Sequence, residues 1–271
     1  MQIKFFCPRW GAESQSWDSF SKKVKDAGFD GIETLVPLDE NEKNEIKDAL
    51  KKQDLLLLGQ YHQSFEKDIK THLANYEKHL RNIAAMHPMA IDSQTGKDYF
   101  TFEENKQLFD LATRISKESG IPIYHETHRN KALFAAHVSK DILSRIPGLQ
   151  ITADFSHWCC VAESFLQDQQ EAMALACSRA AHIHARVGHV EGPQVSDPRA
   201  PEWKTAVDTH LGWWDTIIDQ RRKSGAKITT ITAEFGPADG YLPVMPYTQV
   251  PVADQWEINV YMMKMLRKRY A

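Results

Sequence analysis

The sequence has few cysteines, and their spacing does not suggest a disulfide or metal framework. Four cysteines occur among 271 residues, two of them adjacent at Cys159 and Cys160, and no Cys-x-x-Cys pair is present. A small disulfide-stabilised scaffold would need a denser set, and a zinc ribbon would need paired Cys-x-x-Cys ligands. We therefore expect reduced, mostly buried thiols.

The sequence also lacks an excess of positive charge. Lys and Arg number 33 against 36 Asp and Glu, which gives a formal net charge of -3. Proteins bind nucleic acids largely through clustered Lys and Arg. This balance therefore argues against a nucleic-acid partner.

Long hydrophobic runs are absent as well. No stretch approaches the roughly 18 apolar residues of a membrane span, and residues 1–7 are not followed by the apolar core of a signal peptide. These features predict a cytoplasmic protein with no membrane partner. No linker or low-complexity segment divides the chain, so we expect one domain over residues 1–271.

The sequence does contain a regular alternation of strand-like and helix-like segments. Short β-branched or aromatic runs predict strands at residues 3–7, 31–36, 55–60, 89–92, 122–127, 150–155, 181–187 and 229–235. Helical patterns follow them at residues 17–27, 41–53, 66–86, 102–119, 132–145, 162–177, 205–224 and 254–269. Gly28, Gly120 and Gly225 follow three of these helices, as expected of left-handed helix ends. Eight such units, in a chain near the roughly 250 residues of a TIM barrel, predict an α/β fold with a closed (β/α)8 barrel.

Residue types that bind metals stand at the ends of four predicted strands. Glu126, Asp154, His184 and Glu234 each close a short apolar run. The carboxyl ends of parallel strands meet at one rim of a barrel, where such folds build their sites. Three carboxylates and one imidazole form a hard, oxygen-rich ligand set that suits Mn²⁺, Mg²⁺, Co²⁺ or Zn²⁺. The sequence predicts one divalent metal ion and does not choose among these four.

Two segments, residues 188–203 and 236–251, interrupt the alternation. They contain Pro, Gly, Trp and Tyr without a helical or strand period. Because both follow a strand that carries a candidate ligand, they should leave the barrel on the face of the site. Long loops often serve a site, and Trp203 and Tyr241 offer flat faces for a sugar. We expect the two segments to cover the metal, with a homo-oligomer interface as the alternative.

The strand ends also resemble those of a known superfamily. The motifs are Phe29-Asp30-Gly31-Ile32-Glu33, His125-Glu126-Thr127-His128, Asp154-Phe155-Ser156-His157, His182-Ile183-His184 and Glu234-Phe235. Their order over nearly the whole chain is similar to that in the xylose isomerase-like TIM barrels. That superfamily includes sugar isomerases and epimerases, among them the tagatose and psicose 3-epimerases, and AP endonucleases of the endonuclease IV type. The resemblance implies a xylose isomerase-like barrel.

The resemblance also implies roles for particular residues. The four strand-end ligands would bind one metal ion, and two of them, Glu126 and Glu234, would also transfer protons. His157 and Arg186 match positions that contact substrate oxygens in the epimerases. His62, which follows the third predicted strand, is a further candidate for substrate contact because of its place at the rim.

Two other residues of these motifs have open interpretations. Glu33 is either part of the site or a structural residue bonded across the barrel. His182 lies deeper along its strand than His184, so it is either a core histidine or a support for the metal ligands.

Three activities fit these features unequally. The favoured one is a metal-dependent isomerase or epimerase of a sugar or sugar acid, in which one glutamate removes a proton beside a metal-chelated carbonyl and the other returns it. The second is a metal-dependent lyase or decarboxylase acting on an oxo-sugar acid, whose carboxylate Arg129 or Arg186 would hold. An endonuclease IV-like phosphodiesterase is third, since that chemistry uses more histidine ligands and a basic groove.

Overall fold

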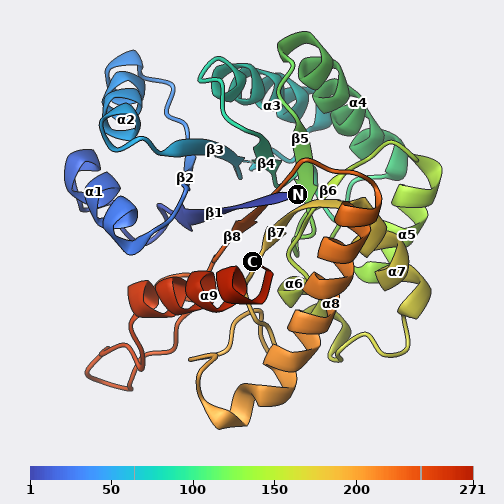
Figure 1. The fold of residues 1–271 in the computed structure, drawn as a ribbon. Helices are drawn as coiled ribbons and strands as arrows, with labels where there is room; N and C mark the ends of the chain where they lie inside the picture. Colours follow the sequence, from blue (N-terminus) through green and yellow to red (C-terminus); the bar gives the residue numbers. More distant parts are fainter. Residues whose placement is uncertain (64, 239, 271) are drawn as a thin grey trace.

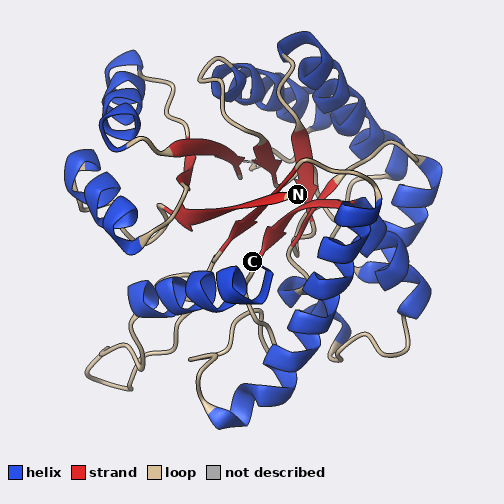
Figure 2. Cartoon of the chain, viewed as in Figure 1, coloured by secondary structure: helices blue, strands red, loops and turns tan. Residues whose placement is uncertain are grey.

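The computed structural model describes residues 1–63, 65–238 and 240–270, and its centre is a closed barrel of parallel strands (Figures 1 and 2). The strands are β1 (Gln2–Pro8), β2 (Gly31–Leu35), β3 (Leu56–Tyr61), β4 (Ile91–Ser93), β5 (Ile123–Glu126), β6 (Ile151–Ala153), β7 (Ala180–His184) and β8 (Ile228–Thr232). Each pairs in parallel with the next, and β8 pairs with β1 to close the ring. The predicted (β/α)8 barrel is confirmed, and all eight predicted strands are present.

Helices form an outer ring around the strands (Figure 2). They are α1 (Trp17–Ala27), α2 (Glu40–Gln53), α3 (Ile69–Ala84), α4 (Phe102–Ser119), α5 (Ala136–Arg145), α6 (Ser156–Ala162), α7 (Gln170–Arg179), α8 (Lys204–Lys223) and α9 (Gln255–Tyr270), with a 3-10 turn at Pro201–Trp203. Ser16, Asp39 and Thr101 cap α1, α2 and α4, because their side chains accept hydrogen bonds from first-turn N–H groups. The helices at Gly28 and Gly120 end in the left-handed conformation, as predicted.

One helix prediction is wrong. In the predicted helix at residues 162–177, residue 162 is the last of α6, residues 163–169 are not helical, and α7 begins at Gln170. Glu163 (φ 47°) and Leu166 (φ 58°) adopt left-handed backbone conformations that a right-handed helix cannot contain. The N–H of Ser164 also bonds the carbonyl of Cys159 at 3.2 Å and ends α6. The chain therefore turns here before α7 begins.

Polar side chains occupy the centre of the barrel. Nδ1 of His182, on β7, lies 3.0 Å from the carbonyl oxygen of Thr230 on β8, and its Nε2 lies 3.5 Å from Oε2 of Glu33 on β2. All three residues are buried. The apolar core lies farther out, where helix residues such as Val24 and Leu80 belong to the main hydrophobic cluster. In such a polar interior, further buried charged groups can find hydrogen-bond partners.

The described residues of the long segments at 188–203 and 236–251 contain little regular structure. The first has a bridge between His189 and Gly192 and ends in the 3-10 turn. The second has a bridge between Val244 and Pro251, and in Figure 1 it projects past the end of α9 at the lower left. The two segments therefore differ in how closely they follow the barrel.

The four cysteines have the reduced state that the sequence predicts. All four cysteines are free thiols, and three of them are buried. Within the described residues, no helix combines the length and the apolar character needed to cross a membrane.

Candidate metal centre

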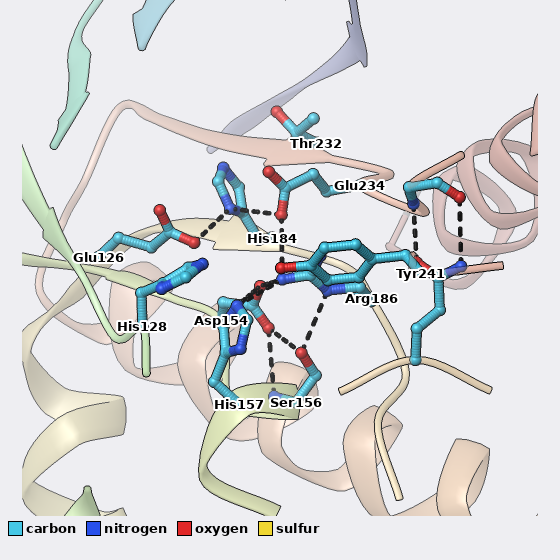
Figure 3. A network of polar contacts seen from close by, with 12 residues as sticks. Glu126, His128, Asp154, Ser156, His157, His184, Arg186, Thr232, Glu234 and Tyr241 are labelled. Carbon is cyan, nitrogen blue, oxygen red and sulfur yellow. Dashed lines mark hydrogen bonds and ion pairs between the residues drawn. The ribbon is translucent and has the colours of Figure 1, made fainter. Parts of the chain in front are cut away.

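The four strand-end residues converge on one point at the carboxyl rim (Figure 3). Glu126 ends β5, Asp154 directly follows β6, His184 ends β7, and Glu234 lies two residues beyond β8. One ligand atom from each lies within 4.8 Å of the others, and all four residues are buried. The structure therefore brings together the whole ligand set that the sequence predicted.

His184 is oriented as a metal-binding imidazole requires. Its Nε2 lies 3.0 Å from Oε1 of Glu33, so this nitrogen can donate its proton across the barrel. Its Nδ1 points to the other carboxylates, 2.9 Å from Oε2 of Glu234 and 3.4 Å from Oε1 of Glu126. Histidine ligands commonly donate their second N–H to a carboxylate, which fixes the ring and its tautomer. Glu33 thus accepts a hydrogen bond across the barrel and orients the ring of His184.

Several oxygens of this cluster lack hydrogen-bond partners. Both carboxylate oxygens of Glu126 and Oε2 of Glu234 are sealed from solvent without a hydrogen bond from any described residue. The other oxygen of Glu234 accepts a hydrogen bond from Nε2 of Gln60 at 3.3 Å. Buried anionic oxygens are costly unless a cation or donors compensate them. The donor set therefore fits a divalent cation.

Asp154 is held by groups on both sides. One of its oxygens accepts hydrogen bonds from the backbone N–H of Ser156, at 3.2 Å, and from the Ser156 hydroxyl. The other accepts from Nη2 of Arg186, which also donates to Nε2 of His157 at 2.6 Å. The two predicted substrate contacts, His157 and Arg186, therefore lie beside the ligand cluster and are bonded to each other. His157 is fully buried and does not line the cavity, whereas Arg186 does.

The pKa values of the cluster reflect its crowded negative charge. Burial raises the pKa of Asp154 to about 7, with Glu234 and Glu126 adding to the shift and Arg186 opposing it. Burial would lower the pKa of His184, but Glu234, Glu33 and Asp92 outweigh burial and raise it well above its usual value. A cation bound here would replace protons on these groups.

We expect the metal affinity to fall as the pH is lowered through about 7. Protonated Asp154 cannot ligate a cation, and its pKa of about 7 lies above the ordinary 3.8. The proton on Asp154 stabilises the metal-free fold fully below the ordinary pKa, and this contribution is lost as the pH rises through about 7. The cation then takes its place, so metal binding should stabilise the protein more at high pH. Thermal melts with and without Mn²⁺ at pH 5.5, 7 and 8.5 would measure this, and an equal shift at all three would contradict it.

A cavity of about 400 Å³ opens beside the cluster. It is lined by Arg9, Trp10, Glu13, Thr34, Leu35, Gln60, His62, Gln94, His128, Arg186, Glu234 and Tyr241. Three of the predicted site residues, His62, Arg186 and Glu234, are among them. Burial, followed by the charge of Lys131, lowers the pKa of His62, so its neutral form faces the cavity.

Tyr241, which the sequence placed near the site, forms part of the cavity wall. The ring of Tyr241 contacts Trp10 edge to face at 4.8 Å and lies 4.9 Å from the guanidinium carbon of Arg186. A side chain at Gly236 would put a Cβ 2.3 Å from the Trp10 ring, so this close packing requires glycine. Trp203 does not line the cavity; it packs against His189 at 4.8 Å.

Two other groups near the centre contain metal-type residues. Glu33, His182 and His184 form one, and Glu126, His128 and His157 form the other. In the first, His182 is already bonded to Thr230, which makes it a satisfied histidine of the barrel interior. His128, which lines the cavity, is the residue of the second group that the sequence reasoning did not select.

Comparison with known proteins identifies the fold. The sequence matches no protein-family model and no curated protein sequence. It is similar in structure to D-allulose 3-epimerase from Methylomonas sp. in complex with D-allulose, with a TM-score of 0.65, 13% identity, and coverage of 99% of this chain and 98% of that one. A xylose isomerase-like TIM barrel protein from Mycobacterium smegmatis in complex with magnesium gives a TM-score of 0.63 at 11% identity, covering 99% of this chain and 98% of that one.

A third similar structure carries a different chemistry. It is a probable 3-DHS dehydratase from Bacillus anthracis, with a TM-score of 0.60, 16% identity, and coverage of 98% of this chain and 99% of that one. At these identities the likeness establishes the fold alone. The chain has the xylose isomerase-like TIM-barrel fold, as the sequence motifs predicted.

Proposed function

We propose that this protein is a divalent-metal-dependent isomerase or epimerase acting on a sugar or sugar acid. The observation that carries the proposal is the placement of two glutamates. Glu126 and Glu234 approach Nδ1 of His184 from different sides, at 3.4 and 2.9 Å, with carboxylate oxygens that lack hydrogen-bond partners (Figure 3). Epimerisation removes a proton from one face of a carbon and returns one to the other face, which two such bases can do.

The metal ion would be Mn²⁺, Mg²⁺, Co²⁺ or Zn²⁺, held by the four-residue cluster, and when bound it would acidify the C–H beside a substrate carbonyl. Glu234 lines the cavity and removes that proton with Oε2, while Gln60 holds its other oxygen at 3.3 Å. Glu126, on the other side of His184, returns the proton. A crowded, buried cluster is where the pKa values of two carboxylates are set apart for these roles.

Other residues of the cavity bind the substrate. Arg186 donates hydrogen bonds to a substrate oxygen, and His157 holds its guanidinium in place at 2.6 Å. His62 contacts the substrate from the end of β3, and Tyr241 stacks on its C–H face. Trp10 and Tyr241 together keep water from the reacting carbon, which would otherwise be protonated at random. The similar epimerase, whose structure contains D-allulose, supports a small-molecule sugar as the ligand.

A lyase or decarboxylase acting on an oxo-sugar acid is the second candidate. It is favoured by Arg186, a buried guanidinium that lines the cavity and suits a carboxylate. The similar dehydratase is consistent with elimination chemistry on this fold. An endonuclease IV-like phosphodiesterase has less support, because the chain carries a net charge of -3.

The proposal is tested by incubating the metal-loaded protein with ketoses and sugar acids in heavy water. An isomerase or epimerase should place deuterium on the carbon next to the carbonyl in recovered substrate and in product, and protein treated with a chelator should not. Mass spectrometry and NMR measure the incorporation. Release of carbon dioxide or water without exchange into substrate would favour the lyase, and activity unchanged by the chelator would contradict the proposal.

A further inference from the structure

Two lysines at the catalytic rim are buried without an ion-pair partner among the described residues. Lys97, after β4, is 6% exposed, and Lys131, after β5, is 4% exposed. Within the part of the chain that the structure describes, neither ammonium group forms an ion pair or a hydrogen bond. Lys43, which is also 6% exposed, instead pairs with Glu40 at 2.5 Å and with Asn82 at 2.9 Å. The lack of a partner therefore distinguishes the two rim lysines from a lysine of equal burial.

The backbone holds both lysines in place without help from their ammonium groups. The side chain of Asn105, on α4, accepts a hydrogen bond from Lys97 N–H at 3.2 Å and donates one to its carbonyl at 3.0 Å. The N–H of Ala132, next to Lys131, bonds the carbonyl of Thr95 at 3.0 Å. The two loops are thus tied together, and both lysines emerge from this joined pair of loops.

The loops that carry both lysines border the cavity. Gln94, three residues before Lys97, lines it, and so does His128, whose carbonyl accepts a hydrogen bond from the N–H of Lys131 at 3.2 Å. Neither Nζ is among the sealed polar atoms without a partner, a set that includes Nε2 of the nearby His72. Lys131 is also close enough to the cavity-lining His62 that its charge, after burial, lowers the pKa of that histidine. A ligand bound in the cavity therefore lies next to the loops that carry these two lysines.

The described carboxylates do not neutralise this pair. Burial, followed by the charge of Lys97, lowers the pKa of Lys131 to about 8. The negative charges of Glu126, Asp98 and Glu66 act in the opposite direction, yet none of them forms an ion pair with Lys131. Burying two neighbouring lysine side chains costs free energy unless an anion compensates the charge of their ammonium groups.

We propose that Lys97 and Lys131 bind an oxyanion carried by the substrate, a phosphate or a carboxylate, at the end of the molecule away from the metal ligands. This inference rests on the proposed function and narrows the substrate class from sugars in general to anionic sugars. An oxyanion accepts charge-assisted hydrogen bonds from both ammonium groups at once. Its negative charge also removes the repulsion between them.

Titration with inorganic phosphate tests the site without any need for turnover. Isothermal titration calorimetry should show that wild-type protein binds phosphate, that Lys97→Gln and Lys131→Gln each weaken binding about tenfold, and that the double variant loses it. Lys67→Gln is the matched control, since Lys67 is an exposed lysine on the neighbouring loop after β3. It changes the net charge equally and should leave the affinity unchanged. Equal phosphate affinity in wild type and double variant, or no binding by wild type, would overturn the proposal.

Two further experiments distinguish failure of the anion site from failure of the proposed function, and they identify the anion. Asp154→Asn, which should lose the metal ion, should still bind phosphate. With turnover as the readout, Lys131→Gln should raise KM about tenfold for whichever substrate the site accepts, a sugar phosphate or a sugar acid, and leave KM for a neutral ketose unchanged. An equal rise in KM for neutral and anionic substrates would contradict the proposal, provided that thermal melts show the variant to be folded.

Discussion

Replacing Glu234 by glutamine should abolish the incorporation of deuterium from heavy water into recovered substrate, and replacing Glu126 by glutamine should abolish its incorporation into product. Glutamine keeps the size of the side chain and one oxygen that can face the metal, but it cannot accept the proton. Loss of a general base typically costs about 10²-fold to 10⁴-fold in rate, so exchange should fall below detection. NMR of the recovered substrate and of the product measures it. Because the two glutamates act in the same transfer, the double variant should lose little more than the worse single variant.

Metal content must be measured in the same samples, because both glutamates are also proposed ligands. Glu13→Gln is the matched control: Glu13 lines the same cavity but stands outside the ligand cluster. It should exchange at the rate of the wild type. A metal-loaded Glu234→Gln variant that exchanges as fast as the wild type would refute the role of Glu234 as the base.

Changing Asp154 to alanine should remove metal binding and lower stability together. The cluster loses one of its four ligands, and we expect the affinity for Mn²⁺ to fall by more than about 100-fold, beyond the effect of changing a supporting residue. The change also removes the carboxylate that accepts a hydrogen bond from the buried Arg186, which keeps its longer contact with Glu234 at 3.6 Å, and breaking a buried pair costs about 3 to 5 kcal/mol. Calorimetry and thermal melts measure the two effects.

The Asp154→Asn variant separates the loss of metal binding from the loss of stability. Asparagine can still accept the hydrogen bonds from Ser156, so the fold should be better preserved while the negative ligand is gone. Asp141→Ala, on the exposed side of α5, removes a carboxylate from a surface pair with Arg145 and should change neither property beyond about 1 kcal/mol. Unchanged Mn²⁺ affinity in Asp154→Asn would contradict the ligand assignment.

The barrel could be predicted from the sequence because its strands are short, apolar and regularly followed by helical patterns. The break between α6 and α7 could not, since the pattern at residues 162–177 is helical throughout. The left-handed conformation of Glu163 ends α6, and Leu166, which is also left-handed, is 2% exposed. Burial of Leu166 is a tertiary effect that overrides local helix propensity, and a single sequence carries no signal for it.

The convergence of the ligands was predictable for a different reason. Parallel strands bring their carboxyl ends to one rim, so Glu126 and Glu234 had to approach each other once the barrel was correct. The cavity wall was less accessible to such reasoning. Trp10 and His128 reach the cavity from loops whose paths follow no periodicity. The hydrogen bond between Arg186 and His157 could not be predicted from the sequence either. Alternation along the predicted strand indicated only that Arg186 lies on the same face as His184.

The closure of the barrel also determines when the metal site can exist. Glu234 lies just beyond β8, whose residues 228–232 pair with residues 2–6 of β1, so the last ligand and the last strand emerge from the ribosome almost together. A nascent chain that ends before β8 holds at most three of the four ligands and leaves one edge of β1 unpaired. Cations favour whichever state binds them. Here that state is the closed barrel, which alone holds all four ligands. The metal ion therefore stabilises the completely synthesised, closed barrel and not an open, incomplete one.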